Sequence, residues 1–467
     1  MLSSEDRIKI CVKLIVVIAL LQMLALFKIF DLRYLIAFCG IMILLLGITV
    51  MSKNFRKMVA GFLFLGTLLN LYTYQPLTSW ISGINYMLNI TAILVIMQLF
   101  VIPIKIGNYS GHFKYLLLQG FKNERHVYIF SSVVISMFST FLLFGTIPVM
   151  LSLLGAPLKQ IVNNYNKFMS TALTRGYAVA VMWAPGAVNI LLVMNVTGVR
   201  WFDIFPVGFA VSILGLGISY CLQKKYLSKV PFNKETCLRT NAAAYEIKAK
   251  QEALRKVLNI VFLVIVLIVL IFSFDVIGIG DNTSRVMLAG LLLVSIWLFT
   301  LRNEKNFKKA VDEYFDVSLV KTIDLAILYV ALGIFSKALE TSEVLEKILP
   351  YVTLLSDQNP ITIISVIILS IMALAMFGLH PFVVIIILGQ VLMSSSLPLD
   401  PRVIALTLLF GSMLSYMLSP FAGMVLTTAK FLNVSIYDVG VKWNGLFGII
   451  LFLIGSGIII LYQLYGV

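Results

Sequence analysis

Two Gly/Pro breaks inside apolar segments recur in the same order about half a chain apart, and no other feature constrains the fold as much. Residues 182–187, Met-Trp-Ala-Pro-Gly-Ala, match residues 417–422, Met-Leu-Ser-Pro-Phe-Ala, at an offset of 235. Residues 144–148, Phe-Gly-Thr-Ile-Pro, match residues 377–381, Phe-Gly-Leu-His-Pro, at an offset of 233. Interruptions that are paired in this way predict an internal repeat built from broken helices.

The amino-acid composition indicates that these segments fold in a membrane. Of the 467 residues, 60% are hydrophobic and only 12% are charged, whereas about a quarter are charged in soluble domains. We therefore expect a polytopic membrane protein with spans of about 20 residues. The apolar runs predict eleven spans, near 10–29, 35–51, 58–74, 80–103, 169–197, 202–222, 256–274, 283–301, 318–338, 402–431 and 444–463.

Two further apolar stretches, 127–155 and 361–396, each contain one Gly-x-x-Pro break, and we expect them to be re-entrant hairpins. Charge supports this interpretation. Most of the 36 Lys and Arg residues fall in alternate loops, which sets a cytoplasmic N-terminus and an extracytoplasmic C-terminus. A full crossing by 127–155 would place the basic loop 223–256 outside. The net charge of +15 is then explained by Lys and Arg residues that collect in cytoplasmic loops and set the orientation of the spans. No nucleic-acid partner is expected.

The predicted fold class is an all-α polytopic membrane protein with about eleven transmembrane helices and two re-entrant hairpins in two inverted repeats. Because each repeat has an odd number of spans, the second repeat has the opposite orientation in the membrane to the first. We expect surface helices near 104–125 and 339–353. The predicted segments are an extra N-terminal helix at 1–34, repeat 1 at 35–222 with its hairpin at 127–155 and broken helix at 169–197, a cytoplasmic basic linker at 223–255, and repeat 2 at 256–463 with its hairpin at 361–396 and broken helix at 402–431.

The breaks have a physical consequence that bears on binding. Pro185 cannot donate a backbone hydrogen bond and Gly186 lets the chain unwind, so a second half-helix begins near the bilayer midplane with its positive end inward. The same holds at Pro420, and after Pro148 and Pro381. Helix N-termini that converge on one region favour binding of an anion. The carbonyl groups at the C-terminal ends of the preceding half-helices are suited to bind Na+ or another cation, so Na+ is a candidate coupling ion. The alternative for each proline is a simple kink.

The candidate substrate-binding residues lie at or beside the breaks, with one arginine inside a span. They are Gly145, Thr146, Pro185, Gly186, Asn189, Gly378, His380, Ser419, Pro420, Gly423, Thr427, Thr428 and Arg175. Arg175 is a functional candidate or extends to the interface, and capping or packing is expected of Asp203 and Asp438. The chain shows no catalytic triad, HExxH, GxxxxGK[ST] or CxxC pattern, so no enzyme activity, cofactor or metal site is predicted.

This arrangement of breaks, hairpins and inverted repeats resembles the ion transporter superfamily, which includes divalent-anion/sodium symporters, citrate carriers and arsenite permeases. The resemblance covers nearly the whole chain and implies an elevator-type transporter, a homodimer in several branches. It does not extend to the substrate, because the symporters carry Ser-Asn-Thr at each hairpin tip. Here residues 145–147 are Gly-Thr-Ile and residues 378–380 are Gly-Leu-His.

The resulting expectation is a secondary transporter in the cell membrane that moves a small organic anion, such as a di- or tricarboxylate, coupled to Na+ or H+. Its expected partners are that small-molecule anion and membrane lipid. An inorganic-ion or cation/proton antiporter is the alternative within the same class. A membrane-embedded enzyme or lipid-linked sugar handling protein is the alternative from another class. Fold resemblance alone does not decide between them.

Overall fold

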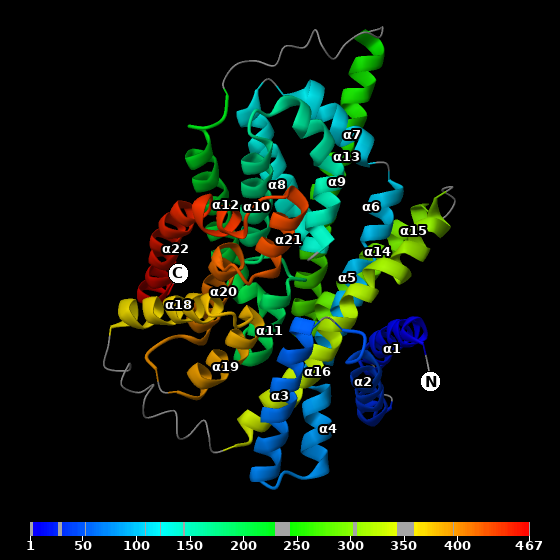
Figure 1. Cartoon of the computed structure of the whole chain (residues 1–467), viewed down its shortest axis with the longest axis vertical. Helices are drawn as coiled ribbons and strands as arrows, with labels where there is room; N and C mark the ends of the chain where they lie inside the picture. Colours follow the sequence, from blue (N-terminus) through cyan, green and yellow to red (C-terminus); the bar gives the residue numbers. More distant parts are fainter. Residues whose placement is uncertain are drawn as a thin grey trace. The chain divides into compact units, whose positions relative to one another are not determined.

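The computed structural model describes residues 3–26, 30–51, 53–107, 109–121, 123–142, 145–228, 243–301, 306–342, 359–395 and 397–466. Every regular element in these ranges is a helix (Figure 1), which confirms the all-α part of the prediction. Eight helical segments of the described residues are long and apolar enough to cross a membrane, so the chain has the make-up of a membrane-embedded protein. The eleven spans, the re-entrant hairpins and the orientation of the termini stay predictions.

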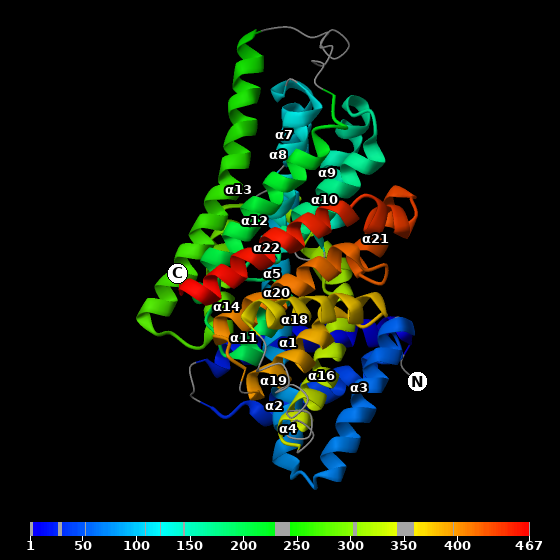
Figure 2. The same ribbon diagram turned by 90° about the vertical axis from the view of Figure 1, so that its left-hand side faces the viewer.

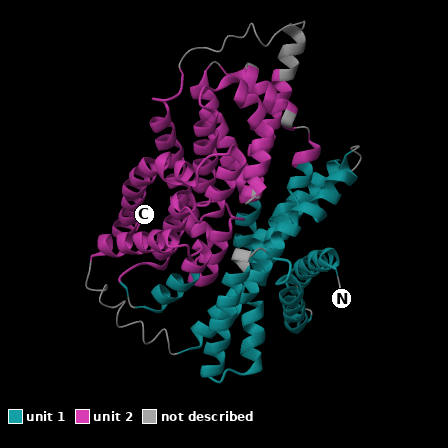
Figure 3. Cartoon of the chain, in the orientation of Figure 1, with its two compact units in different colours: residues 1–103, 269–357, 386–397 teal, residues 104–268, 358–385, 398–467 magenta. Residues whose placement is uncertain are grey.

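The chain divides into two compact units (Figure 3). Unit 1 comprises residues 1–103, 269–357 and 386–397, and unit 2 comprises residues 104–268, 358–385 and 398–467. Each predicted repeat, 35–222 and 256–463, therefore contributes to both units. All thirteen candidate site residues belong to unit 2.

Unit 1 is organised around a helix that is buried along nearly its whole length, α16 (Ile323–Glu340). Glycines let its neighbours approach closely, since a Cβ on Gly333 would overlap the carbonyl oxygen of Gly83 and one on Gly66 would lie 3.0 Å from the backbone of Phe335. Small residues at such interfaces are typical of packing in membranes. The other helices of unit 1 are α1 (Ser4–Ala25), α2 (Arg33–Gly47), α3 (Lys53–Tyr72), α4 (Leu77–Asn85), α5 (Leu88–Gln98), α14 (Asn282–Leu301) and α15 (Phe307–Glu313).

Unit 2 is organised around two helices, α10 (Tyr165–Ala180) and α20 (Pro401–Leu418). Its other helices are α7 (Tyr109–Tyr115), α8 (Glu124–Leu142), α9 (Thr146–Ile161), α11 (Val188–Thr197), α12 (Trp201–Gln223), α18 (Pro360–Met376), α21 (Gly423–Leu432) and α22 (Gly445–Tyr465). Three helices extend across the boundary between the units: α6 (Val101–Ile106), α13 (Ala243–Ile277) and α19 (Pro381–Ser394).

The packing around α10 recurs around α20. Helix α8 packs on α10 and α18 packs on α20, while α12 and α22 cover the same two helices in turn; Figure 2 shows α18, α20 and α22 side by side. A Cβ on Gly176 would lie 2.8 Å from the Ser132 carbonyl oxygen of α8, and one on Gly411 would lie 2.7 Å from the Ile371 side chain of α18. These glycines are 235 residues apart, which is the offset of the sequence match.

Some predicted segments differ from the observed ones or lie outside the described residues. Residues 243–255, predicted as part of the linker, form the first part of α13, while residues 229–242 lie outside the described ranges. Leu143 and Phe144, at the break between α8 and α9, are also outside them. Most of the surface helix predicted at 339–353 falls there too, and its first residues complete α16.

Candidate functional site

Two helices of unit 2 are interrupted where the sequence repeats. Helix α10 ends at Ala180 and α11 begins at Val188; α20 ends at Leu418 and α21 begins at Gly423. The N-cap of α11, Ala187, has φ −67° and ψ 128°, and the N-cap of α21, Ala422, has φ −66° and ψ 128°. Each helix then runs for 10 residues and ends at a left-handed residue. The two half-helices are therefore the same local structure.

The hydrogen bonds of the two turns also correspond. The Ala187 N–H donates to the Ala184 carbonyl at 2.9 Å, and the Ala422 N–H donates to the Ser419 carbonyl at 3.1 Å. Neither alanine offers a side-chain acceptor to the first turn that follows. Because the first N–H groups of a helix have no partner within it, two uncapped and positively polarised helix N-termini result.

The carbonyl side of the first break is covered by α12. The Trp201 indole Nε1 donates to the Trp183 carbonyl at 3.0 Å, and a Cβ on Gly208 would overlap the Met182 carbonyl oxygen. All residues from 168 to 194 are buried. The sequence analysis did not single out Trp201. Its contact with Trp183, 18 residues earlier in the chain, depends on how α12 packs and cannot be read from the sequence.

The second break is open on one side. Ser419 is buried, and its hydroxyl donates to the Ala375 carbonyl of α18 at 2.8 Å, but Phe421 is 58% exposed and Gly423 is exposed. Pro420 is half-buried. The two breaks thus share their backbone geometry and differ in their accessibility.

The turn between α18 and α19 lies against this second break. Gly378 has φ +95°, and a Cβ built on it would lie 3.8 Å from the ring of Phe421. The His380 ring makes an edge contact with Tyr416, with centroids 6.2 Å apart. The structure therefore brings Gly378 and His380 together with the end of α20 and the residue that follows Pro420.

Further polar candidates surround the half-helices. Asn189 of α11 donates from Nδ2 to the Ser412 hydroxyl of α20 at 2.7 Å. Thr146, which begins α9, and Thr428 of α21 are fully buried, and their hydroxyls have no hydrogen-bond partner in the described part of the chain. Helices α9 and α21 pack against each other. Buried hydroxyls without partners are uncommon and mark places where a ligand or water can bind.

Gly145 and Thr427 complete the set, and both are half-buried. Ser412 was not among the predicted residues. A signal for it existed, because Ser412 and Ser415 of α20 and Ser419, its C-cap, recur at helical spacing. The Ser415 hydroxyl donates to the Gly411 carbonyl at 2.8 Å. Their shared face turns toward other helices, since all three are buried.

Arg175 belongs to a separate polar cluster. It is 2% exposed, so it does not extend to the interface. Its Nε donates to Asn444 Oδ1 at 2.8 Å, its Nη2 donates to the Trp443 carbonyl at 2.6 Å, and its guanidinium carbon lies 4.6 Å from the Phe447 ring centroid. None of these partners belongs to a break. The structure thus separates Arg175 from the other twelve candidates.

Asp203 and Asp438 have local roles. Asp203 forms an ion pair with Arg200 at 2.8 Å, and Asp438 accepts a hydrogen bond from Ser435 Oγ at 2.6 Å and pairs with Lys442. The Asp438 N–H also donates to Ser435 Oγ at 3.0 Å, a capping arrangement of the kind predicted. Asp203 instead forms an ion pair, and α12 has no side-chain cap hydrogen bond within the described ranges. The described residues contain no group of three or more His, Cys, Asp or Glu side chains placed to hold a metal ion.

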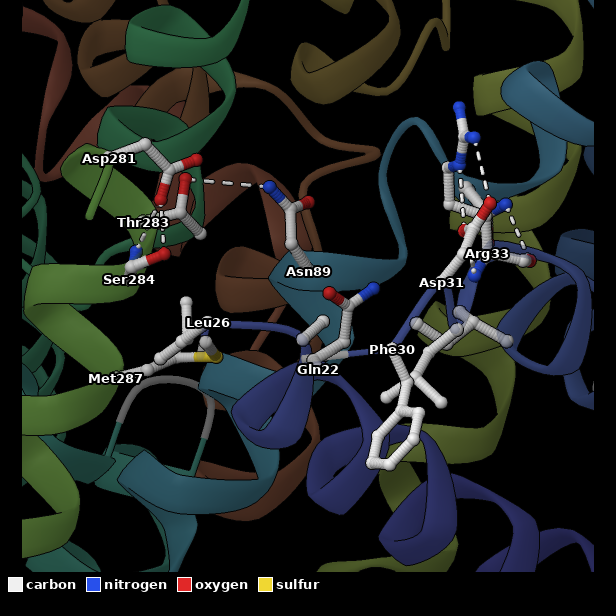
Figure 4. Close-up of a pocket in the computed structure, with 14 residues that line it drawn as sticks. Gln22, Leu26, Phe30, Asp31, Arg33, Asn89, Asp281, Thr283, Ser284 and Met287 are labelled. Atoms are coloured by element: carbon white, nitrogen blue, oxygen red, sulfur yellow. Dashed lines mark hydrogen bonds and ion pairs between the residues drawn. The ribbon is translucent and has the colours of Figure 1, made fainter. Parts of the chain in front are cut away.

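A cavity of about 550 Å³ lies within unit 1, and its lining mixes polar side chains such as Asn89 with apolar ones such as Leu26 and Met287 (Figure 4). Asn89 donates from Nδ2 to Thr283 Oγ1 at 3.4 Å, and Asp281 accepts the N–H of Ser284 at 2.9 Å, which caps α14. Asp31 and Arg33 form an ion pair at 2.8 Å on the other side. None of the candidate site residues lines this cavity.

Comparison with known proteins gives no further identification. No protein-family model matches the chain, and no curated protein matches its sequence. The class that the fold defines is a helical, membrane-embedded protein with two matching broken helices in one unit. Its activity has to be inferred from those residues.

Proposed function

We propose that this protein is a secondary active transporter, of the elevator type, that moves a small organic anion across the cell membrane coupled to Na+ or H+. The observation that carries the proposal is the matching pair of uncapped half-helices, α11 and α21. Irregular backbone within a membrane is tolerated where it lines a protein cavity or meets a ligand. The same interruption occurs twice in one unit, which favours a role in binding over a simple kink at each proline.

The chemistry of the residues favours an anion. The N-terminal ends of α11 and α21 are positively polarised and their N-caps are alanines, so backbone N–H groups remain for an acceptor. The side chains nearby are neutral hydroxyl and amide groups, among them Asn189 and Thr428. A carboxylate suits such donors. The resemblance to the ion transporter superfamily and the dimer it implies are part of this proposal.

The test is ligand-induced thermal stabilisation of the detergent-purified full chain. Carboxylates, phosphate, sulfate and arsenite are each added with and without Na+ at two pH values, since a ligand that binds the folded state raises Tm by mass action. A carboxylate shift that needs Na+ supports a sodium-coupled carrier. A flat response to every anion contradicts the proposal and favours cation exchange or lipid chemistry.

A matched pair of variants links any shift to the site. Thr428→Val removes a buried hydroxyl without a partner, so we expect unchanged or higher Tm without ligand and a lost ligand shift. Thr407→Val makes the same change in α20, where the hydroxyl donates to the Val403 carbonyl at 2.7 Å. We expect it to lower Tm slightly and keep the ligand shift. Equal ligand shifts in the two variants would place binding elsewhere.

A further inference from the structure

A cavity of about 620 Å³ lies in unit 2 between α7 and residues 252–262 of α13, and no described residue of the broken helices lines it. Its lining combines charged and apolar side chains: His112, Glu252, Arg255, Lys256, Leu258, Asn259 and Phe262. The charged residues Glu252, Arg255 and Lys256 come first along α13, and the apolar Leu258 and Phe262 follow them toward the middle of the segment Lys250–Ile277. The cavity is thus polar at one end and apolar at the other.

Two hydrogen bonds and one cation–ring contact connect α13 with residues 107–109 beside this cavity. Lys256 Nζ donates to the Gly107 carbonyl at 2.8 Å and lies 5.2 Å from the Tyr109 ring centroid. Asn259 Nδ2 donates to Tyr109 Oη at 3.3 Å. The ammonium group of Lys256 therefore connects α13 with Gly107, which precedes α7. Arg255 is exposed, and its guanidinium has no hydrogen bond or ion pair within the described residues.

An apolar stripe continues from the cavity along α13. Leu254, Leu258, Phe262 and Ile265 are each more than half exposed, and their spacing of three and four places them on one face of the helix. They belong to a segment, Lys250–Ile277, that is apolar enough to cross a membrane. Acyl chains are what such a face meets in a bilayer.

We infer that this cavity binds an anionic phospholipid, with the phosphate at Arg255 and His112 and the acyl chains along the stripe. Arginine presents a planar fork of donors that matches phosphate. The described charges of the lining, Arg255 and Lys256 against Glu252, sum to a positive site even with His112 neutral. Basic pockets beside spans on the cytoplasmic side attract anionic headgroups, and the basic loop 223–256 is predicted to lie on that side. The inference does not depend on transport.

Native mass spectrometry of the full chain, released from detergent with phosphatidylglycerol or phosphatidylcholine added, tests this inference. We expect one phosphatidylglycerol to be retained in preference to phosphatidylcholine, and Arg255→Gln to weaken its retention about tenfold. Lys225→Gln is the matched control, because Lys225 is exposed in the same basic region and does not line the cavity. It should retain the lipid as the wild type does. Glu252→Gln should strengthen retention.

Three results would overturn the inference. Retention of phosphatidylcholine equal to that of phosphatidylglycerol would show that the site does not distinguish the charge of the headgroup. Equal weakening by Lys225→Gln would show a diffuse charge effect. Displacement of the lipid by millimolar inorganic phosphate would show a site for a soluble anion. A melting curve of each variant is recorded beside the spectra, and if Arg255→Gln lowers Tm, Arg255→Lys takes its place and should show a smaller loss of retention in the same direction.

Discussion

The guanidinium of Arg175 donates from Nε to Oδ1 of Asn444 at 2.8 Å, and both side chains are buried. This bond joins the first broken helix to the residue that precedes α22. Asn444 in turn donates to Thr174 Oγ1 at 2.9 Å and to the Val439 carbonyl at 2.7 Å. No carboxylate takes part in the contacts described for Arg175. Its charge is stabilised by amide and carbonyl dipoles, in a protein class where a buried charge is costly.

Replacement of Asn444 by Leu should therefore destabilise the protein. It removes the acceptor of a charge-assisted hydrogen bond and leaves the guanidinium partly unpaired, so we expect the free energy of unfolding to fall by roughly 1.5–3 kcal/mol. Denaturant unfolding in mild detergent measures it. Adding Arg175→Met to Asn444→Leu should cost less than the sum of the two single changes, because the unpaired charge is gone. Additive effects would show that the two residues are not coupled.

Gly176→Ala should destabilise unit 2 by about 1–3 kcal/mol. Its Cβ would lie 2.8 Å from the Ser132 carbonyl oxygen, and that backbone group cannot move without shifting α8. Gly217→Ala in α12 is the control, since a Cβ there would meet no atom within 4 Å apart from its chain neighbours and the backbone of its own helix, and alanine's higher helix propensity should leave stability unchanged or raised. A comparison of the two Tm values decides this, and equal values would contradict the close approach of α8 to α10.

The ends of the half-helices offer a test of their equivalence. Gly198 has φ +69° and Asn433 has φ +54°, so α11 and α21 both end at a left-handed residue. Gly198→Asn should be tolerated, because Asn occupies this conformation in the other copy. Gly198→Val should cost about 1–2 kcal/mol, since a β-branched residue is strained there. Thermal unfolding of both variants separates them, and equal losses would argue against a local backbone cause.

How much the sequence predicts depends on the range of the interactions involved. The break at Pro185 and its counterpart at Pro420 are local chemistry, a missing N–H and a ring clash, and the helices end within a few residues of them. The apolar runs likewise placed most helices within a few residues. These features depend on neighbouring residues in the chain, which a sequence shows directly.

The contacts that complete the site join residues far apart in the sequence, and no pattern predicted them. Asn189 was a candidate, but its partner Ser412 lies 223 positions later. Arg175 was a candidate because ionisable residues inside a span are often functional, yet its partners come from α12, from the residues before α22 and from α22 itself. The division into two units was not predictable from linear boundaries either, because each unit takes segments from both repeats.

The N-cap of α20 should give the protein an acid-sensitive contribution to stability. Asp400 accepts hydrogen bonds from the N–H of Arg402 at 2.7 Å and from its Nε at 3.0 Å, and this side-chain hydrogen bonding holds the pKa of Asp400 below its usual value of 3.8. A carboxyl whose pKa is depressed in the folded state stabilises it above the unfolded pKa, and the contribution is lost as pH falls through the folded pKa.

Asp400→Asn isolates this charge, because asparagine is also a good N-cap. We expect the wild type to melt higher than the variant by a constant margin from about pH 5 to pH 8, and the margin to shrink below pH 3.8. Melting curves over pH 2.5–8 measure it. Arg402→Gln is the second variant, because it removes the side-chain hydrogen bond that is the main cause of the lowered pKa. It should lose less stability than the wild type does as the pH falls from 5 to 2.5, since the pKa of Asp400 then differs less between the folded and unfolded states. A margin that stays constant down to the lowest pH would mean that the carboxylate of Asp400 acts only as a neutral cap would, with no contribution from its pairing with Arg402.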